Sequence, residues 1–456
     1  MSMSVSSLPI RSYDPDETPA TAASLSAAAQ KRQEYLARLL DLAQSSQPVT
    51  RWVQELRDRA VPLVQAQAFP TTRDEEWRFT DLSALLDVPL EVFRPNRVST
   101  AAIAPFVLPE ASRSRLVFVN GVYAPELSAI ANLPDGLLLG DLSDLEGDAR
   151  LPHYLGKQPG SEELFTALNT VGLRDAAVLL IPRNLVVETP IHLLFVSTTG
   201  ETPIFTQPRC LVVAEPSSAV TLIEDFVTIG AGTYFTNPVS EIWLEENAQV
   251  NHTRLQRDSQ NAYHIGKTAV SQARDSRYTC NAVSVGAGFF RHHLTVYPNG
   301  EQTETHLNGL TMIAGEQVSD THSAIALSRP HCTARQLHKC IIDDRAHAIF
   351  NGKVFVPKTA QLTDAGQLNR NLLLSPKARI DTKPQLEIVA DNVKCTHGAA
   401  VSQLDANEVF YLQSRGIDAA SAQKLLVYAF AYEILNKIPL ASLRQTLSEF
   451  VTAQTH

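Results

Sequence analysis

Two residues near the end of the chain have the types and the spacing of metal ligands. Cys395 and His397 stand two residues apart, between Lys394 and Gly398. On a β-strand alternate side chains share a face, so a thiolate and an imidazole would project together. Such a pair suits a soft metal or an iron–sulfur cluster. On spacing alone, an inert cysteine beside a strand-end histidine is the commoner case.

Further soft ligands stand upstream of this pair. His331 and Cys332 are adjacent, and His338 and Cys340 would share one face of a strand. No carboxylate or second cysteine completes a tetrahedral set, so side chains that face the inside of a β structure are the simpler interpretation. A mononuclear zinc site that uses His331, His338, Cys340 or His397 stays open as an alternative.

One segment comes close to a phosphate-binding loop. Residues 261–268 differ from the P-loop pattern at its first position, where Asn261 replaces the required glycine. A P-loop is followed by a helix, whereas residues 269–271 have the pattern of a strand. We therefore expect no ATP binding by this chain. The sequence also contains no dinucleotide glycine fingerprint, nucleophile elbow, zinc-protease motif or kinase signature.

Two further pairs of polar residues cannot act jointly on a strand, because neighbouring side chains point to opposite faces. His292 and His293 are therefore not expected to chelate one metal ion. Asp343 and Asp344 are a poor acid–base couple for the same reason, and we expect them in a solvated turn.

The composition narrows the functional classes. The chain has 456 residues, a net charge of −9, 44% hydrophobic residues and 19% charged residues. The negative charge argues against a nucleic-acid surface and against binding to anionic membranes. No apolar run reaches the roughly 18 residues of a membrane span. The five cysteines are irregularly spaced, which favours reduced thiols and a cytoplasmic location.

Helices are predicted at the start of the chain. Residues 1–29 lack the hydrophobic segment of a secretion signal and carry acidic residues, so we expect a mobile tail. Residues 30–43 place four apolar side chains at helical spacing, Leu36, Leu39, Leu40 and Ala43. A second helix is expected over residues 51–61, with Pro62 and Pro70 as interruptions.

From Leu116 the pattern changes to strands for nearly 280 residues, without helical periodicity. Short apolar runs occupy residues 116–119, 177–181, 191–196 and 210–213. Similar strands then begin at Ala219, Gln249, Arg277, Gln302 and Thr333, each after turn-forming residues. A period of roughly 25 to 31 residues indicates a solenoid, in which each coil buries its inward side chains by stacking on its neighbours. A β-sandwich is the competing fold, but it would need hairpins at closer spacing.

The last part of the chain is helical again. Asp405 and Asp418 have the positions of helix caps, Gly416 would end the first helix, and Pro439 would end the second. The apolar stripe of the second helix is expected to contain Ala422, Leu425, Leu426, Ala429, Phe430 and Ile434. That of the third is expected to contain Leu440, Leu443, Leu447, Phe450 and Val451. These stripes must pack on the end of the solenoid or on another protein.

Several longer motifs resemble the SufB/SufD family of iron–sulfur cluster assembly proteins, and the SufD branch most closely. The motifs are Glu76-Trp77-Arg78-Phe79-Thr80, Phe350-Asn351-Gly352-Lys353, residues 364–375, residues 383–388, residues 391–399 and residues 410–417. The sparse cysteines also favour the SufD branch. The resemblance covers most of the chain from about Arg73, and it is dense from Phe350 onwards.

The resemblance implies a mainly β fold. A parallel right-handed β-helix over residues 101–400 would be flanked by an N-terminal helical domain, residues 1–100, and a C-terminal helical domain, residues 401–456. It also implies a non-catalytic scaffold subunit in a complex of SufB, SufD and two copies of the SufC ATPase. The β-helix would pair with SufB and the C-terminal helices would dock SufC.

The resemblance also assigns residues to these roles. Cys395 and His397 would face SufB and hold a transient iron–sulfur cluster, with His397 the more important of the two. The surface for SufC would include Ser414, Arg415, Gly416, Ile417, Leu425 and Phe430. No cofactor would be bound permanently by this chain alone, and the isolated chain could form a homodimer. A β-helix enzyme that acts on polysaccharides is the other functional class, but the sequence lacks its carboxylate cluster and its secretion signal.

Overall fold

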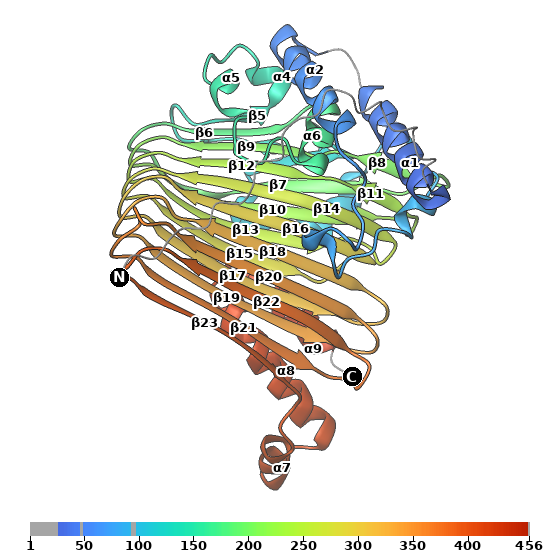
Figure 1. Ribbon diagram of the computed structural model, residues 1–456, viewed down its shortest axis with the longest axis vertical. Helices are drawn as coiled ribbons and strands as arrows, with labels where there is room; N and C mark the ends of the chain where they lie inside the picture. The colour runs from blue at the N-terminus through green and yellow to red at the C-terminus, as the bar shows by residue number, and fades with distance from the viewer. Residues whose placement is uncertain (1–25, 46–48, 93–96, 455–456) are drawn as a thin grey trace, which may run out of the picture.

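The computed structural model describes residues 26–45, 49–92 and 97–454. Its body is a stack of parallel strands that form a β-solenoid, with helices at both ends of the chain (Figure 1). This confirms the parallel β-helix flanked by helices and excludes the sandwich, whose neighbouring strands would be antiparallel. The predicted mobile tail lies outside the described residues up to position 25, but Ala27–Ala29 already belong to helix α1 (Ala27–Gln44).

The strands form two sheets. The first contains, in spatial order, β22 (Arg379–Ile388), β20 (His347–Val356), β18 (Val318–Ala326), β16 (Phe289–Pro298), β14 (Ala262–Gln272), β12 (Val239–Leu244), β9 (Arg209–Ala214), β6 (Ala177–Ile181) and β5 (Leu138–Asp141), with β1 (Glu91–Val92), β8 (Ile204–Thr206) and β11 (Tyr234–Thr236) beside them. The second contains β23 (Lys394–Ser402), β21 (Asp364–Leu373), β19 (Thr333–Ile342), β17 (Glu304–Ile313), β15 (Arg277–Ser284), β13 (Gln249–Arg257), β10 (Ala219–Ile229), β7 (Val186–Thr198), β2 (Ser114–Val119) and β3 (Val122–Tyr123), with β4 (Ala129–Ile130) beside β2. From β13 onwards the chain alternates between the sheets, with one strand of each per coil.

The predicted repeat corresponds to the second sheet. Ala219, Gln249 and Arg277 lie in register on successive strands, and Glu304 and Thr333 continue the same row. The only shift is that β17 begins at Glu304, two residues after the predicted start. The predicted apolar runs lie in β2, β6, β7 and β9.

The turns that precede these strands stack as regularly as the strands. Ser217, Asn247, Asp275 and His331 have φ between 58° and 62°. The N–H of Ser217 donates to Glu246 O at 2.8 Å, and that of Asn247 donates to Arg274 O at 2.9 Å, so each turn is tied to the next coil. These polar residues tolerate the left-handed backbone better than most side chains do.

The expectation of a helix-free region from Leu116 is wrong for three helices, α4 (Leu142–Leu145), α5 (Leu151–Tyr154) and α6 (Leu164–Val171). Helix α6 is buried along its whole length, so no polar face marks its period in the sequence. Pro62 is also not an interruption, because helix α2 (Arg51–Gln65) continues through it. In the last turn of a helix, proline sacrifices a single backbone hydrogen bond.

The N-terminal helix α1 (Ala27–Gln44) buries Leu36, Leu39, Leu40 and Ala43, as its periodicity predicts. Short helix α3 (Thr100–Ile103) follows later. None of the helices in the described part of the chain combines the length and the hydropathy that a membrane crossing requires. The domain limits at residues 100 and 400 stay predictions.

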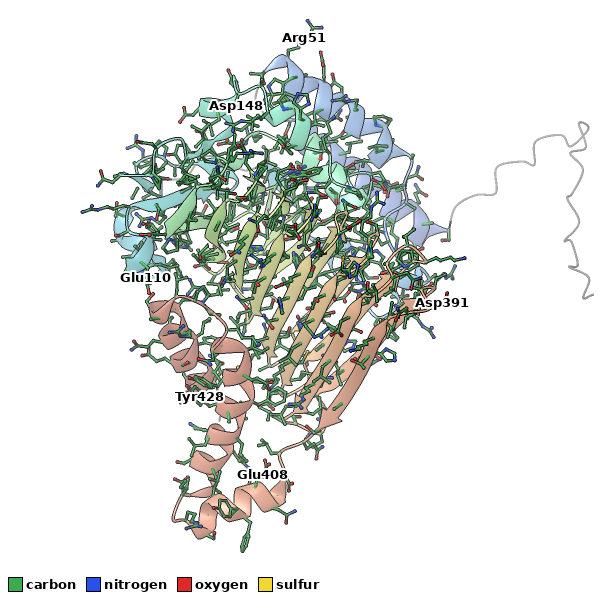
Figure 2. All side chains as sticks on the ribbon, turned by 90° about the vertical axis from the view of Figure 1, so that its left-hand side faces the viewer. Arg51, Glu110, Asp148, Asp391, Glu408 and Tyr428 are labelled. Atoms are coloured by element: carbon green, nitrogen blue, oxygen red, sulfur yellow. The ribbon has the colours of Figure 1, made fainter. Side chains whose placement is uncertain are left out.

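The C-terminal helices are α7 (Ala406–Ser414), α8 (Ala419–Leu435) and α9 (Ala441–Gln454). Helices α8 and α9 pack on the outer face of the second sheet, not on the end of the solenoid as one alternative required. Figure 2 shows Tyr428 of α8 beside the strands and Glu408 of α7 farther out, with Glu110 above the helices. Asp405 and Asp418 cap α7 and α8, and Gly416 follows α7 with φ 87°.

The predicted stripe of α8 is only partly correct. Ala422 and Ile434 are buried, but the buried face also contains Val427, Ala431 and Leu435, whereas Leu425 is 47% exposed. Apolar residues surround this helix, so spacing alone does not select the buried side. The stripe of α9 is confirmed for Leu440, Leu443, Leu447 and Val451, and Phe450 is partly buried against the same cluster.

Candidate functional site: the open end of the solenoid

The last coil of the solenoid consists of β22 and β23, and we call it the open end. Strand β22 pairs with β20 and β23 pairs with β21. Within the described ranges, neither strand has a partner on its other edge. Lys394 N–H donates to Thr363 O, so alternation directs the N–H groups of Cys395 and His397 to the outer edge. The open end therefore presents two rows of unpaired backbone groups.

Cys395 and His397 both lie on β23, and their register confirms that they share a face. Cys395 pairs with Ala365 and His397 with Gln367, whose side chains are buried inside the solenoid. Cys395 is half-buried against the interior cluster, and His397 is exposed. Burial raises the pKa of the Cys395 thiol, so it is protonated at neutral pH.

This pair is not a complete metal site. In the part of the chain that the structure describes, no group of three or more His, Cys, Asp and Glu side chains is arranged to hold a metal ion. His331 lies in an exposed turn, whereas His338 is inside the solenoid, where its ring stacks on Phe350 at 4.9 Å. Burial lowers the pKa of His338 to about 4 and raises that of Cys340 to about 12. The structure thus does not bring the residues of the alternative zinc site together.

The interior of the solenoid contains ionisable side chains that are not among the candidate site residues predicted from the sequence. Glu224 accepts a hydrogen bond from His252 at 2.9 Å, and His252 also contacts the hydroxyl of Tyr278 at 2.9 Å. Burial lowers the pKa of His252, but contacts with Cys280 and Glu224 outweigh it and raise the value to about 9. In the sequence, the signal for these buried ionisable side chains is the series of polar residues at the inward positions of the repeat. They make the interior a hydrogen-bonded network as well as an apolar core.

The fold explains why residues 261–268 resemble a P-loop without forming one. Residues 262–272 form strand β14, and Lys267 binds the carboxylate of Glu163 and the carbonyl of Gly160 on the outer face. Asn261 donates to Ala231 O at 2.7 Å. No phosphate-binding loop is present in this segment. His292 and His293 do point to opposite faces, since His292 bonds Thr268 inside and His293 lies near Glu163 outside.

The C-terminal helices carry a second exposed surface. Phe410 and Tyr411 of α7 are 70% and 58% exposed, and Leu425 of α8 is 47% exposed. Ser414, Arg415 and Gly416 are exposed and Ile417 is half-buried, so the predicted set lies around the α7–α8 turn. Phe430 differs from the others, because it faces the solenoid.

Contacts with Lys339 hold Phe430 against the second sheet. Lys339 Nζ lies 4.3 Å from the Phe430 ring and donates to its carbonyl at 2.9 Å. Glu433 pairs with the same ammonium. These contacts fix α8 on the sheet and leave α7 projecting away from it (Figure 1).

Comparisons with known proteins agree with this architecture. Residues 195–430 match the family model of the SUF system FeS cluster assembly SufBD core domain, and residues 22–193 match that of the SufBD protein N-terminal region. An iron–sulfur cluster assembly SufBD family protein of Synechocystis is 49% identical, over 88% of this chain and 90% of its own. The chloroplastic protein ABCI7 of Arabidopsis thaliana is 35% identical, over 86% and 84%. The iron–sulfur cluster assembly protein SufD of Escherichia coli is 31% identical, over 82% and 87%. The chain belongs to the SufBD family of SUF-system iron–sulfur cluster assembly proteins.

Proposed function

We propose that this chain is a SufD-type scaffold subunit that pairs with SufB through its open end and docks the SufC ATPase through α7 and α8. The observation that carries the proposal is the open end itself. There, two unpaired strand edges lie next to a thiol and an imidazole that cannot complete a metal site alone. A protein that assembles a cluster and then releases it benefits from such a divided ligand set.

Strand edges support the pairing with SufB. An unpaired edge is a template for another strand, and proteins usually block edges that have no partner. Here the open end instead exposes apolar side chains, with Ile388 43%, Val389 57% and Val401 51% exposed. Main-chain hydrogen bonds to a related solenoid would satisfy the edges and bury these side chains. In the isolated chain the same edges would support a homodimer.

The cluster is cargo in this proposal, and the chain holds no cofactor permanently. Cys395 and His397 supply soft ligands from one side, and SufB supplies the others. His397 is the stronger candidate, because it is exposed at the pairing face, whereas Cys395 also packs against the interior. The chain is a scaffold and not an enzyme, so ATP hydrolysis belongs to SufC.

Exposed aromatic residues support the docking of SufC. Phe410 and Tyr411 lie on a projecting helix with no buried residue of its own. Aromatic residues on such a surface are typical anchors of an interface. Arg415 lies over the Tyr411 ring, with 5.3 Å to its centroid, and adds a charged group beside it.

Co-purification of a tagged chain with SufB and SufC from the same cell tests the proposal. Alternation places the N–H of Ala399 on the outer edge of β23, so Ala399→Pro removes one edge donor without breaking the ladder to β21. We expect Ala399→Pro to lose SufB and retain SufC, while the control Ala399→Ser retains both. The isolated Ala399→Pro chain should also be monomeric. Retention of SufB by Ala399→Pro would contradict pairing through this edge.

A further inference from the structure

A directed chain of side-chain amides runs through the solenoid towards the open end. Gln336 Nε2 on β19 donates to Ser323 Oγ on β18 at 2.6 Å. One coil further on, Gln367 Nε2 on β21 donates to Gln336 Oε1 at 2.8 Å. Each glutamine thus directs its side-chain N–H towards the preceding coil and its side-chain carbonyl oxygen towards the following one.

This chain of amides ends at an acceptor without a donor. The Gln367 residue is 4% exposed, and its Oε1 has no hydrogen-bond partner in the structure. Gly352 across the interior leaves room for this side chain, because a Cβ there would lie 2.3 Å from Gln367 Nε2. Buried acceptors in folded proteins almost always have a donor, so this oxygen indicates one that has still to arrive.

The last coil contains one side chain that can supply this donor as an N–H group. His397 pairs in register with Gln367 on the adjacent strand and points to the same face. The other inward side chains of β23 are Cys395, Ala399 and Val401, of which only the Cys395 thiol can donate, and a thiol is a weak donor. Thr382 on β22 already donates to Asn369 Oδ1 at 2.8 Å.

We propose that Gln367 is a positioning residue for His397, accepting one ring N–H of the imidazole and directing the other nitrogen towards the cluster. The part of this proposal that concerns the cluster rests on the proposed function, whereas the hydrogen bond between Gln367 and His397 does not. His397 is exposed, so its ring has room to turn towards Gln367. A histidine ligand commonly donates its second ring N–H to a nearby acceptor, which fixes its tautomer and orientation.

The hydrogen bond can be tested on the isolated full chain. With 15N-labelled histidine rings, two-bond correlation spectra at a pH above the titration range of histidine report the tautomer. The His397 signals are assigned by their loss in His397→Gln. We expect a single tautomer in the wild-type chain and a mixture in Gln367→Met, which keeps the bulk and removes the acceptor. Gln317→Met, which alters a buried glutamine that donates to Ala287 O, should leave His397 unchanged.

Iron binding by the complex with SufB and SufC tests the role in loading. We expect Gln367→Met to weaken iron binding about tenfold, the scale of a lost partner of a metal ligand, and Gln317→Met to have no effect. Gln336→Met, one coil deeper, provides a milder second variant that loosens Gln367. An unchanged tautomer in Gln367→Met would overturn the inference and leave the proposed function standing. A changed tautomer with wild-type iron loading in His397→Ala would instead overturn the proposed function, and with it the role of Gln367 in loading.

Discussion

Glu76 and His322, 246 residues apart in the chain, are joined by a hydrogen bond of 3.2 Å between Glu76 Oε2 and His322 Nδ1. The contact fixes the segment that carries the motif of residues 76–80 on the outer face of β18. Arg291 stacks on the Trp77 ring, 3.8 Å from its centroid, and Thr80 donates to Asp320. Glu75 binds Lys383 of β22 at 2.8 Å, so the same segment reaches the last coil.

This contact predicts a pH-dependent contribution to stability. The hydrogen bond from His322 lowers the pKa of Glu76 below 4.5. Burial lowers the pKa of His322, but Asp320 and Glu76 raise it above 6.5 overall. The carboxylate contributes above its unfolded pKa, and the imidazolium contributes below its own, so the pair is strongest between about pH 4.5 and 6.5.

We therefore expect Glu76→Gln to reduce the free energy of unfolding by about 0.5 kcal/mol near pH 6 and by less near pH 9. Urea unfolding at both pH values measures the difference. Glu76 also interacts with Arg291 and His293, so the measured difference includes these contacts, whereas Glu163 and Lys267 beside His293 are present in both chains. A destabilisation that grows with pH would contradict the account of the pair.

The turn before β21 predicts a stabilising substitution. Leu362 has φ 58°, a left-handed backbone conformation that is strained for leucine. Its side chain is 48% exposed, so its burial offsets little of this strain. Its N–H donates to Asn392 O at 2.7 Å, which ties the turn to the last coil. Leu362→Asn should raise the free energy of unfolding by about 0.5 to 1 kcal/mol, because asparagine tolerates this backbone. Lys358→Asn, in the same loop, is the control, and equal or lower stability of Leu362→Asn would refute the explanation.

Docking of SufC is best tested with point substitutions. Deletion of α8 and α9 would expose Ile223, Leu255 and Leu310 on the outer face of the second sheet, so a truncated chain would not report docking alone. Phe410→Asp should instead weaken SufC binding at least about tenfold while the melting temperature stays unchanged. Leu63→Asp on α2, an exposed apolar site far away in the sequence, is the control. Unchanged SufC affinity for Phe410→Asp would place the docking site elsewhere.

The isolated chain should neither hydrolyse ATP nor bind it tightly. Lys267 is buried in its ion pair with Glu163, and Lys267→Ala should lower the free energy of unfolding by about 1 kcal/mol through the lost hydrogen bonds. Phosphate release and equilibrium dialysis with ATP measure the activity, and chemical denaturation measures the stability. Intrinsic ATPase activity that disappears in Lys267→Ala would contradict the structural assignment of this lysine.

Much of the architecture is predictable from the sequence, because the coils of the solenoid repeat the same local pattern of turn residues followed by a strand. Turn residues such as Asn247 and Asp275 precede each strand of the second sheet, and the strands start in register after them. The strands of the first sheet form a repeat that the sequence pattern does not reveal, since the lateral strands β8 and β11 and varied turns interrupt their spacing. The sequence pattern does not predict helix α6, because burial on all sides removes the polar face that reveals a helix.

The site was predictable only in part. Alternation along a strand placed Cys395 and His397 on one face, as the structure shows. The location of both residues in the last coil depends on where the stack ends, which no local pattern records. The alignment of Gln367 beneath His397, 30 positions later, likewise depends on the length of every turn in between.

The most direct test of the account is the iron and sulfide content of the complex with SufB and SufC when it carries His397→Ala. Absorbance and iron analysis measure the cluster, with Cys395→Ser as the comparison and subunit stoichiometry as the control for assembly. We expect a strong loss of cluster in His397→Ala, a milder loss in Cys395→Ser, and intact complexes with unchanged melting temperatures in both. Wild-type cluster content in His397→Ala would contradict it and leave this residue only a structural role.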